Sequence, residues 1–350
     1  MRLSVVIPCL NEEHGLDRLQ DALLDALPAI TSDFEVLLVD DGSDDGTLEA
    51  LRKLSAQDAR FRYLALSRNF GKEAAMLAGL SQATGDAVAI MDADLQHPPV
   101  LLDSMVTLLA QGYDQVVARR TRTGDSAVRT LVSRTYYRLI NRVVEVQLEN
   151  GVGDFRVLSR RAVQALLSLG EYNRFSKGLF AWIGFDTAVV DYENVVRQGG
   201  SSKWTLRSLL NYGIDGVVSF NNRPLRMAIY LGVLTTVLAF AYAGYVVVDA
   251  YVQGIAVPGY VTLMVGIIGL GGLQLLFLGV IGEYVGRMYY ETKRRPHFLI
   301  KEASGDKAPV TFALGPEAVD HLTEQSDSHS PRRADGAESV PTPARRKRTP

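Results

Sequence analysis

Two long segments without a charged residue constrain this chain more than any other feature. They cover residues 229–248 and 259–282 of a 350-residue chain in which 47% of the residues are hydrophobic. About 20 apolar residues in a helix, at about 1.5 Å each, span the hydrocarbon core of a bilayer. Buried core helices are the alternative, but they are usually shorter and carry a polar stripe. The sequence therefore predicts a two-helix transmembrane hairpin over residues 224–290.

The charges beside these segments predict how the hairpin is oriented. Arg223 and Arg226 precede the first segment, and the loop between the segments carries one acid and no base. Basic residues stay on the cytoplasmic side of a membrane, and the N-terminus shows no signal-peptide pattern. We therefore expect a multi-pass protein of the cell (inner) membrane with its catalytic domain and both termini in the cytoplasm. The basic residues after the second segment are Arg287, Lys293, Arg294 and Arg295.

The regions on either side of the hairpin differ in kind. Apolar residues recur at helical spacing in residues 205–223, which indicates an amphipathic helix lying in the membrane interface or an ordinary core-facing helix. Residues 291–350 are predicted to be a cytoplasmic tail, disordered after about residue 303. That part is rich in proline and polar residues and has no hydrophobic periodicity.

Residues 1–204 form the remaining unit. Apolar runs at residues 3–8, 34–39, 63–66 and 87–91 alternate with helix-like stretches. Continuous apolar strands that alternate with helices are typical of a parallel sheet with both faces covered. The predicted fold class of this domain is therefore α/β.

Polar clusters follow these four apolar runs. They lie at residues 11–13, 40–43, 67–69 and 92–94. Ligands of open α/β sheets bind outside the carboxyl ends of the strands, so we expect the clusters to converge on one crevice. No G-x-G-x-x-G follows the first strand and no G-x-x-x-x-G-K-[ST] occurs, which argues against a dinucleotide-binding dehydrogenase and a P-loop NTPase.

The residue types in these clusters suggest a chemistry. Asp92 and Asp94 follow a buried strand and can share Mg²⁺ or Mn²⁺, with Gln96 as a further oxygen ligand. Asp41 can accept hydrogen bonds from a nucleotide base or ribose, although a role in the turn is the alternative. Lys72, at the predicted start of a helix, is suited to a diphosphate; otherwise it is a surface lysine.

A dense set of arginines lies further along the chain, although the net charge is −2. The overall charge argues against a nucleic-acid partner. Three of the arginines are spaced by four residues and would share one helix face. They could capture a phosphate on a lipid or rest on anionic headgroups, and both interpretations stay open. The set comprises Arg119, Arg120, Arg122, Arg129, Arg134, Arg138 and Arg142.

An ordered set of motifs makes the chain recognisable over about residues 3–300. Together they resemble family 2 glycosyltransferases of the polyprenyl-phosphate type, which include dolichyl-phosphate mannose synthases and bactoprenol glucosyltransferases. The motifs are VVIPCLNEE (5–13), LLVDDGSDDGT (37–47), LSRNFGKEAAMLAGL (66–80), MDADLQHPP (91–99), GDFRVLSRRA (153–162), RQGGSSKW (197–204) and IGEYVGR (281–287).

The resemblance implies a GT-A-like, Rossmann-related mixed sheet with helices on both faces, a nucleoside diphosphate sugar and a divalent cation. Two positions depart from the family pattern: His97 stands where an acid is frequent, and Val100 where Glu commonly follows the two prolines. By motif matching, the nucleotide-binding residues are Pro8, Asn11, Glu12, Asp41, Lys72 and Asp92; the metal ligands are Asp92, Asp94 and Gln96; the acceptor-phosphate residues are Arg120, Arg134, Arg197 and Lys203; and the catalytic residues are Asp94, Asp154 and Arg156.

We therefore expect a membrane-anchored inverting glycosyltransferase that moves a hexose to polyprenyl phosphate at the cytoplasmic membrane face. Glucose from UDP-glucose and undecaprenyl phosphate are the first choice, and GDP-mannose is the second. A processive polysaccharide synthase is disfavoured because such enzymes usually carry Q-x-x-R-W and more spans. A non-catalytic membrane scaffold would not need the charged constellation. A homo-oligomer and a membrane flippase are further partners that we consider.

The acceptor also bears on the need for a general base. A phosphate monoester has a second pKa of about 6 and is largely dianionic at pH 7, so no side chain needs to take its proton. We therefore predict that Asp154 orients Arg156 or the acceptor pocket. Its alternatives are a true base and a structural acid in a turn after Gly153.

Overall fold

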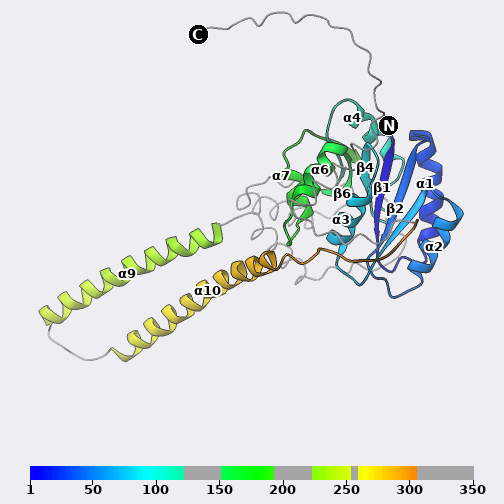
Figure 1. The fold of residues 1–350 in the computed structure, drawn as a ribbon. Helices are drawn as coiled ribbons and strands as arrows, with labels where there is room; N and C mark the ends of the chain where they lie inside the picture. The colour runs from blue at the N-terminus through cyan, green and yellow to red at the C-terminus, as the bar shows by residue number, and fades with distance from the viewer. Residues whose placement is uncertain (122–150, 193–222, 254–258, 306–350) are drawn as a thin grey trace, which may run out of the picture.

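The computed structural model describes residues 1–121, 151–192, 223–253 and 259–305 (Figure 1). The interfacial helix predicted over residues 205–223 lies outside the described residues apart from its last residue. Three of the acceptor-phosphate residues also lie outside them, namely Arg134, Arg197 and Lys203.

An eight-stranded mixed sheet forms the centre of the domain that precedes the hairpin, in the order β7-β5-β6-β4-β1-β2-β3-β8. β1 pairs in parallel with β2 and β4, and β2 with β3, as the alternating pattern predicts. β6 is antiparallel to β4 and β5, and β8 is antiparallel to β3. The strands are β1 (Leu3–Cys9), β2 (Phe34–Asp40), β3 (Phe61–Leu66), β4 (Ala87–Ile90), β5 (Gln115–Arg120), β6 (Val152–Ser159), β7 (Thr187–Tyr192) and β8 (Ile300–Ala303).

Helices cover both faces of the sheet, because the inner strands are apolar on both sides. One core packs alternate β1 residues such as Val5 against α1, α2 and α4. The other packs Val6 and Leu37 against α3, α6 and α7. The first helix, α1, starts at Leu16 and carries Pro28 inside its last turn. The helices are α1 (Leu16–Ile30), α2 (Thr47–Gln57), α3 (Lys72–Gln82), α4 (Leu101–Ala110), α6 (Arg160–Ser168) and α7 (Ser176–Trp182).

Two long helices, α9 (Arg223–Gln253) and α10 (Tyr260–Lys293), form a hairpin that projects from the domain (Figure 1). Large apolar side chains on the hairpin are exposed, among them Phe240 and Leu275. Among the described residues, one segment is long and apolar enough to cross a membrane, Gly269–Lys293, while Tyr230–Tyr242 is a shorter apolar stretch. The two-helix hairpin is thus present, and the membrane crossing by both helices stays a prediction.

The chain returns to the catalytic domain after α10, within the region assigned to the tail. β8 adds to the edge of β3, and Phe298, just before it, is 1% exposed in the second core. Glu302 accepts two hydrogen bonds from the Arg52 guanidinium and one from the Tyr63 hydroxyl, at 2.5–2.9 Å. The exit of the hairpin is therefore tied to the same sheet that supplies the candidate site.

Candidate active site at the carboxyl ends of the central strands

The loops after β1 and β2 are joined by hydrogen bonds between side chains and backbone. The Asn11 backbone N–H donates to Ser43 Oγ at 3.0 Å, and its side-chain oxygen accepts from the Asp44 N–H at 2.9 Å. The Glu12 N–H donates to Thr47 Oγ1 at 2.9 Å. Asn11 has a φ of 56°, in the left-handed region that Asn tolerates better than most residues. Two of the predicted polar clusters therefore form one surface beside Pro8, which lies in β1.

Asp41 ties the end of β2 to the loop that precedes α3. Its two carboxylate oxygens accept the backbone N–H groups of Phe70 and Gly71 at 2.8 and 2.9 Å. Asp41 is buried, and this burial raises its pKa although the two N–H groups act in the opposite direction. Each carboxylate oxygen keeps a second lone pair, so Asp41 supports this loop and still has capacity to accept a further hydrogen bond.

Lys72, the first residue of α3, joins two carboxylates from different strands. Its Nζ lies 2.6 Å from Asp92 Oδ1, after β4, and 2.6 Å from Asp154 Oδ2 in β6. Burial disfavours the ammonium, but the charges of Asp154 and Asp92 outweigh it and raise the pKa of Lys72. Burial would likewise raise the pKa of Asp154, yet the charge and hydrogen bond of Lys72 bring that pKa below its ordinary value. Lys72 and Asp154 are therefore both charged at neutral pH.

Asp94 follows Asp92 in a loop where Leu95 has a positive φ of 55°. One Asp94 oxygen accepts the backbone N–H of Gln96 at 3.1 Å, and the other accepts the Gln96 side-chain amide at 2.8 Å. In this arrangement Gln96 donates to Asp94. In the described part of the chain, no three His, Cys, Asp or Glu side chains gather as a metal site. Protein ligands alone therefore do not form a closed metal cage here.

The two aspartates nevertheless fit a hard divalent cation of the Mg²⁺ type. Such ions are usually held by one or two carboxylates and completed by substrate phosphates and water. Asp92 already faces a cationic group, the Lys72 ammonium, and Asp94 is exposed beside it. The donor set is therefore suited to a cation that arrives together with a diphosphate.

Arg156 lies behind these acids and is 3% exposed. Its guanidinium carbon sits 3.5 Å from the centroid of the Phe180 ring, and Nη2 donates to the Gly153 carbonyl at 2.9 Å. Burial lowers the pKa of Arg156 to about 10, so it remains charged at neutral pH. Because the guanidinium is enclosed, Arg156 is placed to hold the β6 backbone around Asp154.

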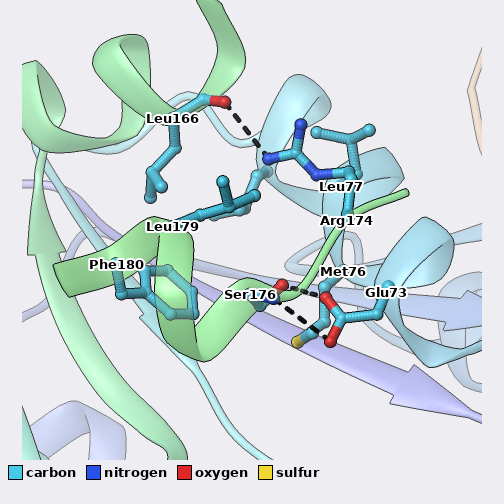
Figure 2. A pocket seen from close by; sticks show the side chains of 9 residues that line it. Glu73, Met76, Leu77, Leu166, Arg174, Ser176, Leu179 and Phe180 are labelled. Atoms are coloured by element: carbon cyan, nitrogen blue, oxygen red, sulfur yellow. Dashed lines mark hydrogen bonds between the residues drawn. The ribbon is translucent and has the colours of Figure 1, made fainter. Parts of the chain in front are cut away.

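Glu73, the residue after Lys72 in α3, lines a small cavity together with residues of α6 and α7 (Figure 2). Its carboxylate accepts from the Ser176 hydroxyl and backbone N–H at the start of α7. Arg174 on the same wall donates to the carbonyls of Leu166 and Leu169. Sequence reasoning missed the Glu73–Ser176 pair, which fastens α7 to the helix that carries Lys72.

His97 and Tyr192 form a second contact that sequence reasoning missed. The Tyr192 hydroxyl lies 2.6 Å from His97 Nδ1, and the His97 ring stacks on Phe155 with centroids 5.1 Å apart. Burial lowers the pKa of His97 and raises that of Tyr192. His97 therefore connects the loop of Asp94 to β6 and β7. The sequence offered one signal for this role, the departure from the family pattern at His97.

Arg120 ends β5 and pairs in register with Tyr192 of β7. The structure thus places Arg120 on the same edge of the sheet as His97 and the acids. The structure brings the predicted site residues that it describes to one edge of the sheet. Asp154 and Arg156 lie in β6, beside the carboxyl ends of the neighbouring strands. The others lie at those carboxyl ends, namely Pro8, Asn11, Glu12, Asp41, Lys72, Asp92, Asp94, Gln96 and Arg120.

Comparison with known proteins identifies the family. The model described as "Glycosyl transferase family 2" matches residues 4–167, and the one described as "GtrB C-terminal hairpin" matches residues 223–288. The putative glycosyltransferase CsbB of Bacillus subtilis is 53% identical over 302 residues, which cover 86% of this chain and 92% of that protein. The chain belongs to glycosyl transferase family 2.

A second relative and a solved structure also match most of the chain. The prophage bactoprenol glucosyl transferase homolog of Escherichia coli K12 is 36% identical, over 86% of this chain and 99% of that protein. The crystal structure of mannosyl-3-phosphoglycerate synthase from Rubrobacter xylanophilus is 20% identical, covers 74% of this chain and 78% of that chain, and has a TM-score of 0.43. This family 2 chain is therefore a glycosyltransferase whose catalytic domain is followed by a hairpin of the GtrB C-terminal type.

Proposed function

We propose that this glycosyltransferase transfers a hexose from a nucleoside diphosphate sugar to undecaprenyl phosphate at the cytoplasmic membrane face, with inversion at the anomeric carbon. UDP-glucose is the first choice of donor, and GDP-mannose the second. The name of the Escherichia coli relative supports glucose and a bactoprenol acceptor. The exposed apolar helices of the hairpin support a membrane-bound acceptor.

One observation carries the proposal: Lys72 bridges Asp92 and Asp154 at 2.6 Å from each. This bridge lies at the edge of the sheet where the loops after β1, β2 and β3 meet. Two anionic substrates must approach each other in the proposed reaction, and fixed positive charge is needed to gather them. Lys72 supplies such a charge and is held in place by acids from two strands. When a diphosphate binds, its oxygens can replace part of this pairing.

The tied loops after β1 and β2 are proposed to hold the nucleoside. Asp41 would accept from the base or ribose with its remaining lone pairs, and Asn11, Glu12 and Pro8 would form the adjoining wall. The hydrogen bonds from Phe70 and Gly71 already fix the Asp41 carboxylate. The nucleoside would therefore meet a preformed acceptor, which lowers the entropic cost of binding.

Asp92 and Asp94 are proposed to hold Mg²⁺ or Mn²⁺, with the Gln96 side-chain oxygen as a further ligand. When bound, such a cation stabilises the charge of the leaving diphosphate. In the structure Gln96 donates its amide to Asp94, so the side chain must rotate before its oxygen can act as a ligand. Without that rotation, Gln96 orients the Asp94 carboxylate.

The acceptor phosphate is proposed to meet Arg120 together with Arg134, Arg197 and Lys203. The phosphate oxygen itself acts as the nucleophile, because it is already largely deprotonated at pH 7. The ion pair between Lys72 and Asp154 supports an orienting role for Asp154, since a carboxylate engaged with an ammonium is a weak base. Arg156 supports the same strand from its buried position.

The experiment is a transfer assay with purified full-length protein, undecaprenyl phosphate and sugar-labelled UDP-glucose or GDP-mannose. We expect a chloroform-soluble, acid-labile product from one donor, dependent on the acceptor, with its anomeric configuration opposite to that of the donor by NMR. Asp94→Asn is the matched inactive control. Transfer to water alone, or a product with retained configuration, would contradict the proposal. A labelled polymer would instead indicate a processive synthase.

A further inference from the structure

A polar groove of about 320 Å³ lies where the catalytic domain meets the exit of the hairpin. Its walls come from the loop after β3, the first turn of α3, the loop between α6 and α7, and the segment after α10. Among the described residues, none of those proposed above to bind donor, metal or acceptor lines this groove. The residues that line it include Arg68, Phe70, Glu73, the run Tyr172–Asn173–Arg174, and His297.

Two arginines give the groove a positive character. The Arg68 guanidinium is exposed and lies 4.0 Å above the Phe70 ring centroid. Arg174 donates to the Leu166 and Leu169 carbonyls, at 3.2 and 2.6 Å. Arg68 donates to the Asn69 carbonyl at 2.8 Å and also acts on the Asp41 carboxylate. Carbonyl groups hold a guanidinium in place without neutralising it, so both arginines can still attract an anion.

The described lining residues of the groove also include one acid and one histidine. Glu73 is the acid among the described lining residues; it is bound to Ser176, and burial raises its pKa. Burial, with the charge of Arg174, lowers the pKa of His297 to about 4, so its ring is neutral at pH 7. Both Glu171 and Glu73 act on Arg174, and of these two acids only Glu73 lines the groove.

Asn173 provides an independent observation. Its Nδ2 is enclosed, and no hydrogen-bond partner for it exists among the described residues. Buried amide groups in folded proteins nearly always have a partner, and each exception requires an explanation. A ligand oxygen in the groove would supply an acceptor to this side chain after a small rotation.

The groove lies next to the end of the proposed membrane hairpin. Tyr172 stacks on Tyr290 of α10, with centroids 5.6 Å apart, and its backbone N–H donates to Glu291 at 2.8 Å. It also stacks on His297 at 5.7 Å. Exposed basic residues end the helix and follow it, and tyrosine beside basic residues is typical of the membrane interface. They are Lys293, Arg294 and Arg295.

We propose that this groove binds the phosphate of an anionic phospholipid headgroup, with Arg68 and Arg174 as its charge partners and Asn173 as an additional donor. A pocket of basic residues at the cytoplasmic end of membrane helices is suited to such headgroups. The inference that the groove binds a phosphate group rests on the two arginines and Asn173. The assignment to a lipid rests on the membrane anchoring given under the proposed function.

The test is a thermal-shift titration of the detergent-purified full-length protein with short-chain phosphatidylglycerol, phosphatidylcholine or inorganic phosphate. A ligand that binds the folded state raises the midpoint with concentration. We expect phosphatidylglycerol to stabilise the protein, and Arg68→Gln or Arg174→Gln to weaken its apparent Kd about tenfold, as for a lost hydrogen bond to a charged group. Arg60→Gln is the matched control, because Arg60 also lies over an aromatic ring, Phe34, but outside the groove.

Asn173→Leu keeps the test informative if Arg174→Gln does not fold. Leucine has a similar size and needs no acceptor, so the midpoint without lipid should be maintained while lipid binding weakens. Equal stabilisation by phosphatidylcholine, or wild-type binding by both Arg68→Gln and Asn173→Leu, would overturn the proposal. Stabilisation by inorganic phosphate as strong as that by phosphatidylglycerol would support the anion site and overturn its assignment to a lipid. Lipid binding without hexose transfer would count against the proposed function alone.

Discussion

The catalytic domain and the hairpin use the same apolar residue types in opposite ways. In β2, Leu37 and Val39 are fully buried between sheet and helices, whereas Phe240 in α9 is 75% exposed and Leu275 in α10 is 71% exposed. The domain removes its apolar surface from water by its own packing. The hairpin satisfies its backbone internally, as a helix in lipid must, and leaves its side chains uncovered. The stability of the first region is therefore intrinsic, and that of the second depends on its surroundings.

The largest expected effect separates chemistry from anchoring. Asp94→Asn should lower hexose transfer about a thousandfold, because several kcal/mol of charge stabilisation are lost when a metal ligand is removed. The protein should stay in the membrane fraction, since the hairpin is unchanged. Chelation by EDTA should silence the wild type, and Mg²⁺ or Mn²⁺ should restore it. Full activity in excess chelator would disprove the metal requirement.

A pair of leucine truncations tests the comparison directly. Leu37→Ala should reduce the free energy of unfolding by about 2–5 kcal/mol, since it leaves a cavity in a packed core. Leu275→Ala should change it by no more than about 0.5 kcal/mol, because this exposed side chain packs against little of the protein. Denaturation of the full-length protein in detergent measures both. Equal losses would show that the hairpin is packed by protein in solution.

An acid-dependent effect is expected at the junction of the two regions. The folded protein holds His297 neutral with a pKa of about 4, against 6.5 for the unfolded chain. The unfolded state therefore binds more protons between these values, and stability falls as pH is lowered from about 6.5 toward 4. His297→Gln should remove this part of the pH dependence of the thermal midpoint, whereas substitution of the exposed His14 should not. An unchanged pH profile in His297→Gln would show that His297 does not cause the loss of stability at low pH.

The smallest effect is expected from Tyr192→Phe, which deletes the hydroxyl that contacts His97 Nδ1. A lost hydrogen bond of this kind is worth about 1 kcal/mol, so kcat should fall about fivefold. KM for the donor should change little, because the nucleoside loops are not touched. Tyr113→Phe, at an exposed tyrosine, is the control. A wild-type kcat would show that the contact does not position the site.

Much of the catalytic domain could be predicted from local patterns. The four apolar runs are strands, and their polar ends meet in space, because parallel strands present their carboxyl ends at one edge. Asp41 and Asp92 were singled out for this reason, and Lys72 for its place at the start of a helix. The three residues lie together. The hairpin also followed from the lengths of two uncharged segments.

The remaining features depend on contacts between residues far apart in the chain. Three such contacts are those of Glu73 with Ser176, Tyr192 with His97, and Lys72 with Asp154. No periodicity in the sequence predicts these pairs. The strand at Ile300–Ala303 was missed for the same reason, since four residues of mixed polarity become a strand by pairing with β3. Local sequence patterns predict a helix or a strand, whereas these contacts form only when the strands are assembled into the sheet.

The return of the chain to β3 has a consequence for biosynthesis. β3 ends at Leu66, and the strand that covers its edge begins at Ile300, so residues 67–299 leave the ribosome between the two halves of this pairing. Translation runs from the N-terminus, and domains fold as they emerge. The hairpin is therefore made before the sheet is complete. A chain whose synthesis stops after α10 would carry an uncovered sheet edge, the feature through which unfinished proteins aggregate. Completion of the last strand thus marks a nascent chain whose hairpin has already been synthesised.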